Sequence, residues 1–173
     1  MIEIKMTGLL YQEIKKDLAR PHPFAAERVG FVFGKLGSLS GKSKAVILTR
    51  YHSIPDDQYE EDDTVGARIG SEAMGTAMQA IFKGRITKEG IFHIHVHEHQ
   101  GPTGMSRVDA DGLPPMMPGF QAMGRTAAHG IIILSHDHGS GWTWLPGASE
   151  PIVADAMTVI GPSVRVFKQE VAK

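Results

Sequence analysis

The sequence contains no cysteine among its 173 residues. This absence excludes disulfides, thiol nucleophiles and cysteine-based zinc sites together, so any metal must be held by His, Asp or Glu. Basic residues (18 Lys and Arg) are not in excess over acidic ones (19 Asp and Glu). We therefore expect no general nucleic-acid binding.

Long apolar runs are also absent. No segment approaches the roughly 20 apolar residues that a membrane helix needs. The first residues, MIEIKMTGLL, mix charged and apolar side chains and lack the apolar region of a signal peptide. We therefore expect a cytoplasmic protein that has no membrane partner.

The overall composition is that of one globular domain. Hydrophobic residues make up 42% of the chain and charged residues 21%, which is enough to bury a core. No internal repeat or linker interrupts the chain, so residues 1–173 are expected to form a single domain. Its class is α/β (α+β), with a mixed sheet flanked by helices.

Hydrophobic periodicity and turn residues predict the order strand, helix, two strands, helix, strand, helix and three strands. Ser71 is a candidate cap for the second helix. Pro114, Pro115 and Pro118 restrict the third helix to part of its span. The predicted strands cover 2–6, 28–36, 45–54, the stretch from 90, 131–134, 142–145 and 157–167; the predicted helices cover 9–20, 68–82 and part of 109–124.

Two polar segments connect these elements. Residues 56–63 (DDQYEEDD) are expected to form an acidic loop. Such a run is usually solvated, although it could dock a basic partner. The His136-Asp137-His138 cluster is interpreted as a turn between the strands at 131–134 and 142–145, and not as a second metal site.

The stretch GIFHIHVHEHQGPTGMSRVD, residues 90–109, holds four of the nine histidines at every second position. Side chains two apart in a strand point to the same side. His93, His95 and His97 therefore share one face, while Phe92 and Ile94 face the core. Two such imidazoles and a carboxylate from the following loop would leave one open position on zinc, as in catalytic sites. The alternative is a polar strand face whose histidines are hydrogen-bonded separately.

Other architectures that carry His-x-His fit this chain poorly. The sequence has no His-Glu-x-x-His, which excludes helix-borne zincins. A barrel hydrolase needs a longer chain. The metallo-β-lactamase pattern requires Asp-His where this sequence has His99-Gln100. Cupins are almost entirely strand, whereas two good helical patterns occur here.

The sequence resembles the JAMM/MPN+ metalloproteases, which include deubiquitinases and prokaryotic JAB-type relatives. The family motif is an upstream glutamate, then His-x-His, seven residues, Ser, two residues and Asp. Here AERVGFVFG supplies Glu27, Gly30 and Gly34 of the family's Glu-x-x-Gly-x-x-x-Gly strand, and Ser106 and Asp109 match Ser-x-x-Asp. The order of elements agrees from about residue 9 to residue 145.

The sequence departs from the motif in the spacing between the histidines and the aspartate. With His95 and His97 as the pair, Asp109 lies one residue too far along the chain. The pair His93 and His95 would need three extra residues, and the pair His97 and His99 would need one fewer. We prefer His95 and His97, because a glycine-rich loop absorbs one insertion easily.

One feature favours the earlier pair. The family often has a glycine three residues before its first histidine, and Gly90 precedes His93 by that spacing. His95 belongs to both leading alternatives. In the preferred register His93 is expected to support a ligand or pack, and His99 to be exposed.

The resemblance implies one zinc ion (Zn2+) per chain on His95, His97 and Asp109. It implies that Glu27 takes a proton from the attacking water and passes it to the leaving amine. Ser106 would help to hold the developing oxyanion. Taken separately, Glu27 could be a solvated residue at a strand start, and Ser106-x-x-Asp109 a helix capping box.

The resemblance also implies a substrate: a ubiquitin-like protein or its conjugates, cut at the C-terminal tail. The stretch from Gly101 to Phe120 looks most like bacterial JAB proteins encoded beside E1-like, E2-like and ubiquitin-like proteins, some in antiphage operons. Met105, Met116 and Met117 could edge a groove for an extended tail or fill the core. Two alternatives remain: a zinc hydrolase of a small amide or a sulfur-carrier protein, and a non-catalytic MPN-type scaffold or metal sensor.

Overall fold

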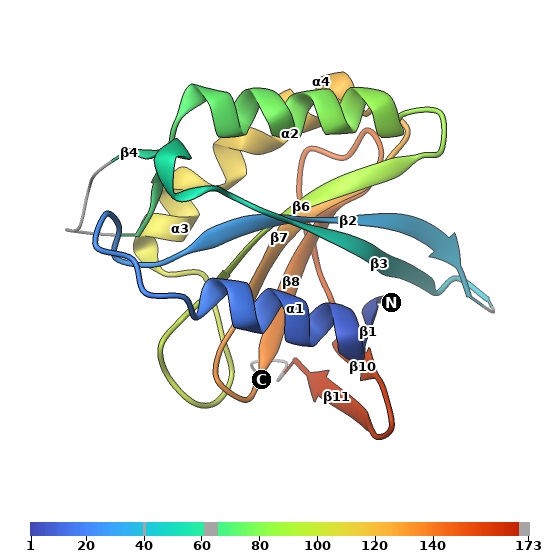
Figure 1. Ribbon diagram of the computed structural model, residues 1–173. Helices are drawn as coiled ribbons and strands as arrows, with labels where there is room; N and C mark the ends of the chain where they lie inside the picture. The colour runs from blue at the N-terminus through green and yellow to red at the C-terminus, as the bar shows by residue number, and fades with distance from the viewer. Residues whose placement is uncertain (40, 61–65, 170–173) are drawn as a thin grey trace.

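The computed structural model describes residues 1–39, 41–60 and 66–169 (Figure 1). In it the chain forms a curled mixed sheet flanked by helices, as the sequence predicts. The strands of this sheet are β1 (Ile2–Thr7), β2 (Val29–Ser38), β3 (Lys44–Ser53), β6 (Glu89–Val96), β7 (His129–Leu134), β8 (Gly139–Trp144), β9 (Ile152–Val153), β10 (Ala156–Ile160) and β11 (Val164–Lys168). The helices are α1 (Gly8–Leu18), α2 (Ser71–Gly84), α3 (Arg107–Gly112) and α4 (Met117–Met123), with short 3-10 helices η1 (Asp56–Gln58) and η2 (Pro114–Met116).

The strands lie in the order β11-β10-β1-β3-β2-β6-β7-β8-β9. Pairs β1–β10, β1–β3 and β6–β7 are parallel, and the other neighbours are antiparallel. The long strands β2 and β6 therefore lie near the centre of the sheet. Both faces of a central strand can be buried, which suits a site that must exclude water.

Helices cover both faces of the sheet (Figure 1). On one face α1 packs through Leu10, Ile14 and Leu18, which recur at a spacing of four residues. On the other face α2 buries Ala73 and Ile81 in a second core cluster, together with residues of α4. Helical periodicity predicted both helices. Helix α2 begins at Ser71, however, and residues 68–69 of its predicted span form the short strand β5 (Arg68–Ile69).

The ends of the elements agree less well with expectation. Thr7 caps α1, because its side chain accepts a hydrogen bond from the Leu10 amide. The expectation that Ser71 caps α2 is wrong: Gly70 is the N-cap, and Ser71 is the first helical residue. The third helical region is broken into α3, η2 and α4 around its prolines, as predicted.

The connection after β3 holds more structure than the acidic loop expected there. It contains η1 and a short strand β4 (Tyr59–Glu60), which pairs with β5 (Arg68–Ile69). Residues 61–63 of that expected loop lie outside the described residues. Among the described helices, none combines the length and apolar character that crossing a membrane would require.

Gly90 marks the closest approach of two strands. A Cβ added there would lie 1.6 Å from the Ala128 carbonyl oxygen, a separation that requires the backbone to shift. Gly90 is therefore explained by the packing of β6 against the start of β7. Its position carries no information about which histidines form the pair.

We expect Gly90→Ala to destabilise the protein strongly, by at least about 2 kcal/mol, because backbone cannot yield as a flexible side chain does. Gly75→Ala is the matched control, since nothing lies within 4 Å of an added Cβ in the middle of α2. There alanine should stabilise by about 0.5–1 kcal/mol. Urea unfolding of both variants measures the difference, and equal midpoints would contradict this account of Gly90.

Candidate metal centre

The alternating sequence of β6 sends its residues to opposite faces of the sheet. Phe92 and Ile94 join the core cluster beneath α1. His93 lies on the other face, with its ring edge-on to Phe31 at 6.0 Å between centroids, and His95 follows at 5.5 Å from His93. Both faces of β6 are buried, so His93 and His95 are core residues as well as polar ones.

The pairing of β2 with β6 brings Glu27 to the histidines. Val29 lies opposite His95 in an antiparallel register. Glu27 precedes Val29 by two residues and His97 follows His95 by two, so the same register places them across from each other. The sequence expected Glu27 on the strand; it lies just before the strand begins.

The loop after His97 is held by the turn between β7 and β8. The Asp137 carboxylate accepts a hydrogen bond from the Gly101 amide at 2.6 Å, and the Ser135 hydroxyl donates to the Gly101 carbonyl at 2.8 Å. The His136 amide donates to the His99 carbonyl. The 136–138 segment is thus a turn, as predicted, and it fixes the loop that leads to Asp109.

A helix cap orients Asp109. Ser106 is the N-cap of α3: its hydroxyl accepts from the Asp109 amide at 3.1 Å, while Asp109 Oδ2 accepts from the Ser106 amide at 2.8 Å. This is the capping box that the sequence left as an alternative for these residues. The same cap turns the Asp109 carboxylate toward the histidines. It therefore stabilises the start of α3 and also places Asp109 where it could bind a metal ion.

Three side chains, those of His95, His97 and Asp109, converge at this point. The Nε2 atoms of His95 and His97 are 3.0 Å apart. His97 Nε2 lies 3.1 Å from Asp109 Oδ2, and His95 Nε2 lies 3.3 Å from Asp109 Oδ1. A tetrahedral zinc ion with bonds of about 2.0–2.1 Å spaces its ligand atoms about 3.3 Å apart. The donor atoms and their spacing therefore fit such an ion.

Glu27 completes the group from the opposite side. One carboxylate oxygen of Glu27 and one nitrogen each of His95 and His97 lie within 4.8 Å of one another, so these three residues could hold a metal ion. Asp109 lies 3.1 and 3.3 Å from the nitrogens of the same two histidines. The site therefore offers two carboxylates, those of Glu27 and Asp109, beside one pair of imidazoles.

The electrostatics of the group suit a cation. Burial opposes ionisation of Asp109, but the hydrogen bond and charge of His95 and the bonds from Ser106 hold the pKa of its carboxyl well below its usual range. Burial, reinforced by the neighbouring His95, lowers the pKa of His97. A carboxylate that stays ionised beside an imidazole that stays neutral is the pair of forms a metal needs.

Glu27 has the opposite tendency. Burial raises the pKa of its carboxyl; His95 opposes that shift and the charge of Asp109 adds to it. A carboxyl whose pKa is raised accepts a proton more readily. The surroundings of Glu27 and Asp109 therefore shift the pKa values of the two carboxyls in opposite directions.

The group opens to solvent through a cavity of about 430 Å³, lined by Glu27, His97, Glu98, Ser106 and Asp109 among others. Since the Ser106 hydroxyl uses a lone pair to cap α3, its proton is available for donation. A second cavity of about 170 Å³ lies against Glu27, His93 and Asp109. A substrate carbonyl could enter the first cavity beside all the candidate catalytic groups.

The remaining histidines of the stretch, His93 and His99, neighbour this group without belonging to it. His93 is buried, and its Nδ1 has no hydrogen-bond partner in the described part of the chain. His99 is exposed, as expected. Met105, Met116 and Met117 all pack with the core cluster on this face, and each also borders a cavity.

The chain matches no protein-family model, and a search of curated proteins gives no match either.

We expect the purified protein to hold about one zinc ion per chain, and His95→Ala and His97→Ala to lose it, because each removes one of a minimal set of ligands. His93→Ala should retain zinc. Metal analysis by mass spectrometry on matched samples measures this. Zinc lost from His93→Ala but kept in His97→Ala would mean that the pair is His93 and His95.

His93 should also make stability depend on pH. Burial first, and then the charge of His95, lower its pKa from 6.5 to about 3. Between these values the unfolded chain binds a proton that the folded protein excludes, so stability falls as pH falls. In metal-free protein, His93→Gln should reduce this slope by up to about 1.4 kcal/mol per pH unit. Urea titrations from pH 4 to pH 7 test it; an unchanged slope would contradict the neutral, buried state of His93.

Proposed function

We propose that the chain is a zinc-dependent peptidase of the JAMM/MPN+ type, with an MPN-like fold, that cuts the bond following the C-terminal tail of a ubiquitin-like protein. One observation carries the proposal. His95, His97 and Asp109 bring their donor atoms to 3.0–3.3 Å from one another, and Glu27 approaches the same point from the neighbouring strand.

The fold supports this proposal by the way in which it supplies the ligands. His95 comes from a central strand and His97 directly follows that strand. The aspartate comes from the first turn of a helix, and the glutamate from the segment before the paired strand. The resemblance stated from the sequence implies the same origins for the same residue types. The single extra residue lies in the loop containing Gly101, whose φ of +90° is suited to glycine.

The chemistry follows from the residues around the cavity. Zinc, when bound, supplies a Lewis acid with an open coordination position, which favours hydrolysis at neutral pH. Glu27 accepts a proton from the attacking water and returns it to the nitrogen of the leaving amine. Ser106 donates its hydroxyl proton to the carbonyl oxygen as negative charge develops there. His95, His97 and Asp109 hold the ion.

The substrate class comes from the resemblance and from the shape of the site. The cavity is open at one side and bordered by the ends of β6 and α3, so an extended tail can lie across it. Partners of the E1-like and E2-like kinds, a role in bacterial antiphage conjugation and a cytoplasmic location belong to the same proposal.

The proposal is tested with zinc measured on the same samples as activity. The substrates are ubiquitin and bacterial ubiquitin-like proteins, each carrying a fluorogenic amide at the C-terminus. Glu27→Gln should retain zinc and fold but lose about 100- to 10,000-fold in kcat, because it removes a general base and none of the proposed zinc ligands. Asp109→Ala should lose both zinc and activity. Glu13→Gln, an exposed residue of α1, is the matched control and should behave as wild type.

Two outcomes would overturn parts of this proposal. Near-full activity in Glu27→Gln would show that this mechanism does not operate. If the wild type holds zinc and hydrolyses a small amide but cleaves none of the protein substrates, the assignment of the metal centre survives and the substrate class is wrong.

A further inference from the structure

Four consecutive residues around Glu27 are tied to residues on either side of 61–65, namely Asp56, Tyr59 and Gly66. The amides of Ala26 and Glu27 both donate to the Gly66 carbonyl, at 2.9 and 3.3 Å. The next two residues are tied through side chains, Arg28 to Asp56 and Val29 to Tyr59. Glu27 thus lies in a stretch of chain whose every residue has a partner among these three.

Arg28 makes several hydrogen bonds to its surroundings. Its side chain is only 1% exposed. Its guanidinium donates to Asp56 Oδ1 at 2.8 Å, to the Arg20 carbonyl at 3.0 Å and to the Pro21 carbonyl at 2.9 Å. Burying a cation costs free energy unless its donors are satisfied, and here three different groups accept from it.

Aromatic rings enclose the same guanidinium. Its carbon lies 5.1 Å from the centre of the Phe24 ring and 5.9 Å from that of Tyr59, within the range of cation–π contacts. The Tyr59 hydroxyl in turn accepts from the Val29 amide at 3.1 Å and donates to the Val29 carbonyl at 2.9 Å. The ring therefore fixes both Arg28 and the first residue of β2.

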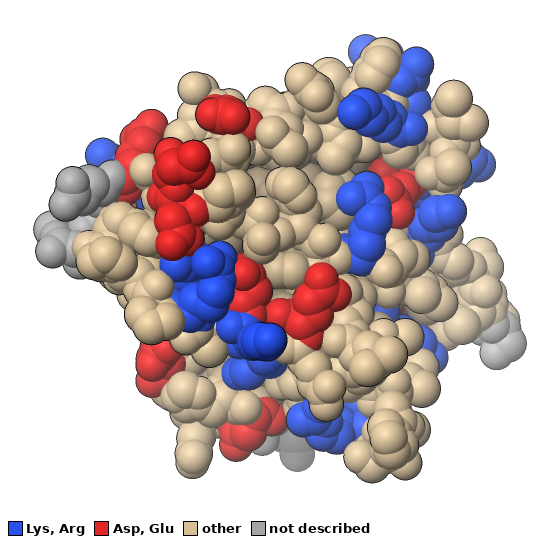
Figure 2. Space-filling model, in the orientation of Figure 1, with Lys and Arg blue, Asp and Glu red and all other residues tan. Residues whose placement is uncertain are grey.

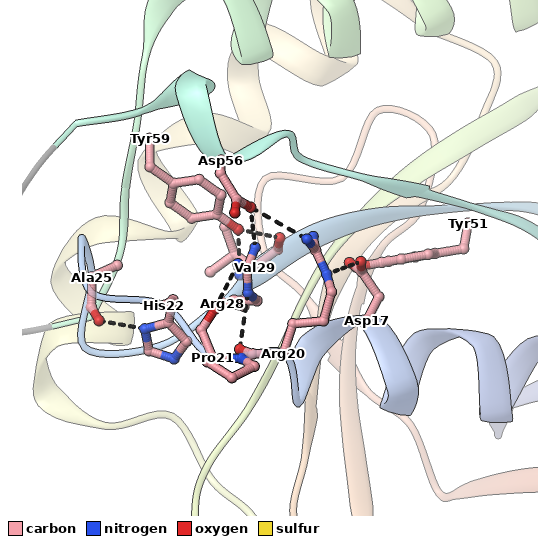
Figure 3. A network of polar contacts seen from close by, with 10 residues as sticks. All are labelled: Asp17, Arg20, Pro21, His22, Ala25, Arg28, Val29, Tyr51, Asp56 and Tyr59. Carbon is pink, nitrogen blue, oxygen red and sulfur yellow. Dashed lines mark hydrogen bonds and ion pairs between the residues drawn. The ribbon is translucent and has the colours of Figure 1, made fainter.

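A chain of charges connects this point to the rest of the fold (Figure 3). Asp56 also pairs with Arg20 at 3.3 Å, Arg20 bonds Asp17 at 2.8 Å, and Asp17 accepts from the Tyr51 hydroxyl at 2.7 Å. The network joins the end of α1, strand β3 and η1. Figure 2 shows acidic and basic side chains next to one another on this face of the molecule.

Gly30 makes room for the last member of this chain. A Cβ there would lie 2.3 Å from the Tyr51 hydroxyl oxygen, so the glycine that matches the family pattern lets Tyr51 cross β2 and reach Asp17. The network is thus built into the start of the strand that follows Glu27.

From these contacts we propose that Arg28, held by Asp56 and Tyr59, is the positioning residue for Glu27. Glu27 lies with His95 and His97 at the metal centre, while the next residue, Arg28, anchors the same backbone to Asp56 and to the Arg20 and Pro21 carbonyls. Without the anchor the Glu27 carboxylate can leave the point that the histidines and Asp109 define. The inference rests on the proposed role of Glu27 as proton shuttle. It adds that Arg28, Asp56 and Tyr59, which do not touch substrate, hold Glu27 in place for that role.

The first test measures the anchor without any activity. Arg28→Lys keeps the charge but loses the planar fork that reaches three acceptors, and Tyr59→Phe keeps the ring but loses both bonds to Val29. In metal-free protein, each variant should speed amide hydrogen exchange at Ala26 and Glu27 by about tenfold or more, because local opening becomes easier.

Arg50→Lys is the matched control for both tests. Arg50 also makes an ion pair, to Glu89 at 2.6 Å, and also stacks on an aromatic ring, 3.6 Å from the centre of Phe33. Its described interactions include none with Asp56, Tyr59, Gly66 or the metal centre. Exchange at Ala26 and Glu27, and kcat, should stay at wild-type values.

The second test measures catalysis on the ubiquitin-like substrate that the wild type cleaves. Arg28→Lys should retain zinc and KM while kcat falls about 10- to 100-fold, as expected when a catalytic group is misplaced by about 1 Å. Combined with Glu27→Gln it should cause no further loss, since Arg28 acts only through Glu27. A residue that merely stabilised the fold would lower zinc content or reduce kcat further in the double variant.

The outcomes separate this inference from the proposed function. If Arg28→Lys and Tyr59→Phe leave the exchange of Ala26 and Glu27 unchanged, or if the Arg28→Lys loss adds in full to that of Glu27→Gln, the positioning role is overturned. If the wild type cleaves none of the substrates, the proposed function fails, and the exchange measurement alone decides whether Arg28 holds Glu27.

Discussion

The antiparallel pairing of β2 with β6 is the constraint on which the site depends. It sets Val29 opposite His95, and it therefore sets Glu27 across from His97. A shift of one residue would turn every side chain of the shifted strand to the other face of the sheet. Glu27 would then point toward the α1 side, and the histidines would lose the carboxylate. Because both faces of β6 are packed with large apolar residues, such a shift would also break both cores.

Local sequence patterns predicted a good part of this arrangement. The alternation in β6 correctly separated His93 and His95 from Phe92 and Ile94, because the two-residue period of a strand is a property of the backbone alone. The spacing of Ser106 and Asp109 pointed to a capping box, which the structure contains. Helical periodicity placed α1 and α2. These features need only neighbours along the chain, so the sequence carries them directly.

Features that depend on distant segments escaped prediction. The anchoring of Arg28 needs Asp56 and Tyr59, which are brought close only when the sheet forms. The role of Asp137 in holding Gly101 depends likewise on β7 lying beside β6. Gly90 was interpreted as part of a motif, although the nearby Ala128 carbonyl explains it. The sequence shows an arginine, Arg28, next to the candidate base Glu27. It does not show that this arginine is buried, so Arg28 is expected to be an ordinary residue at the start of a strand.

The charge states of the folded protein form one system that favours a cation. Burial keeps His93 and His97 neutral, whereas hydrogen bonds keep Asp109 ionised. These are also the forms that bind a divalent cation, which favours neutral imidazole and ionised carboxylate. Burial has the opposite effect on Glu27: it raises the pKa of the carboxyl, so this group is protonated more readily. The site thus separates a carboxylate that holds its charge from one that protonates more readily, as the proposed metal-assisted hydrolysis requires.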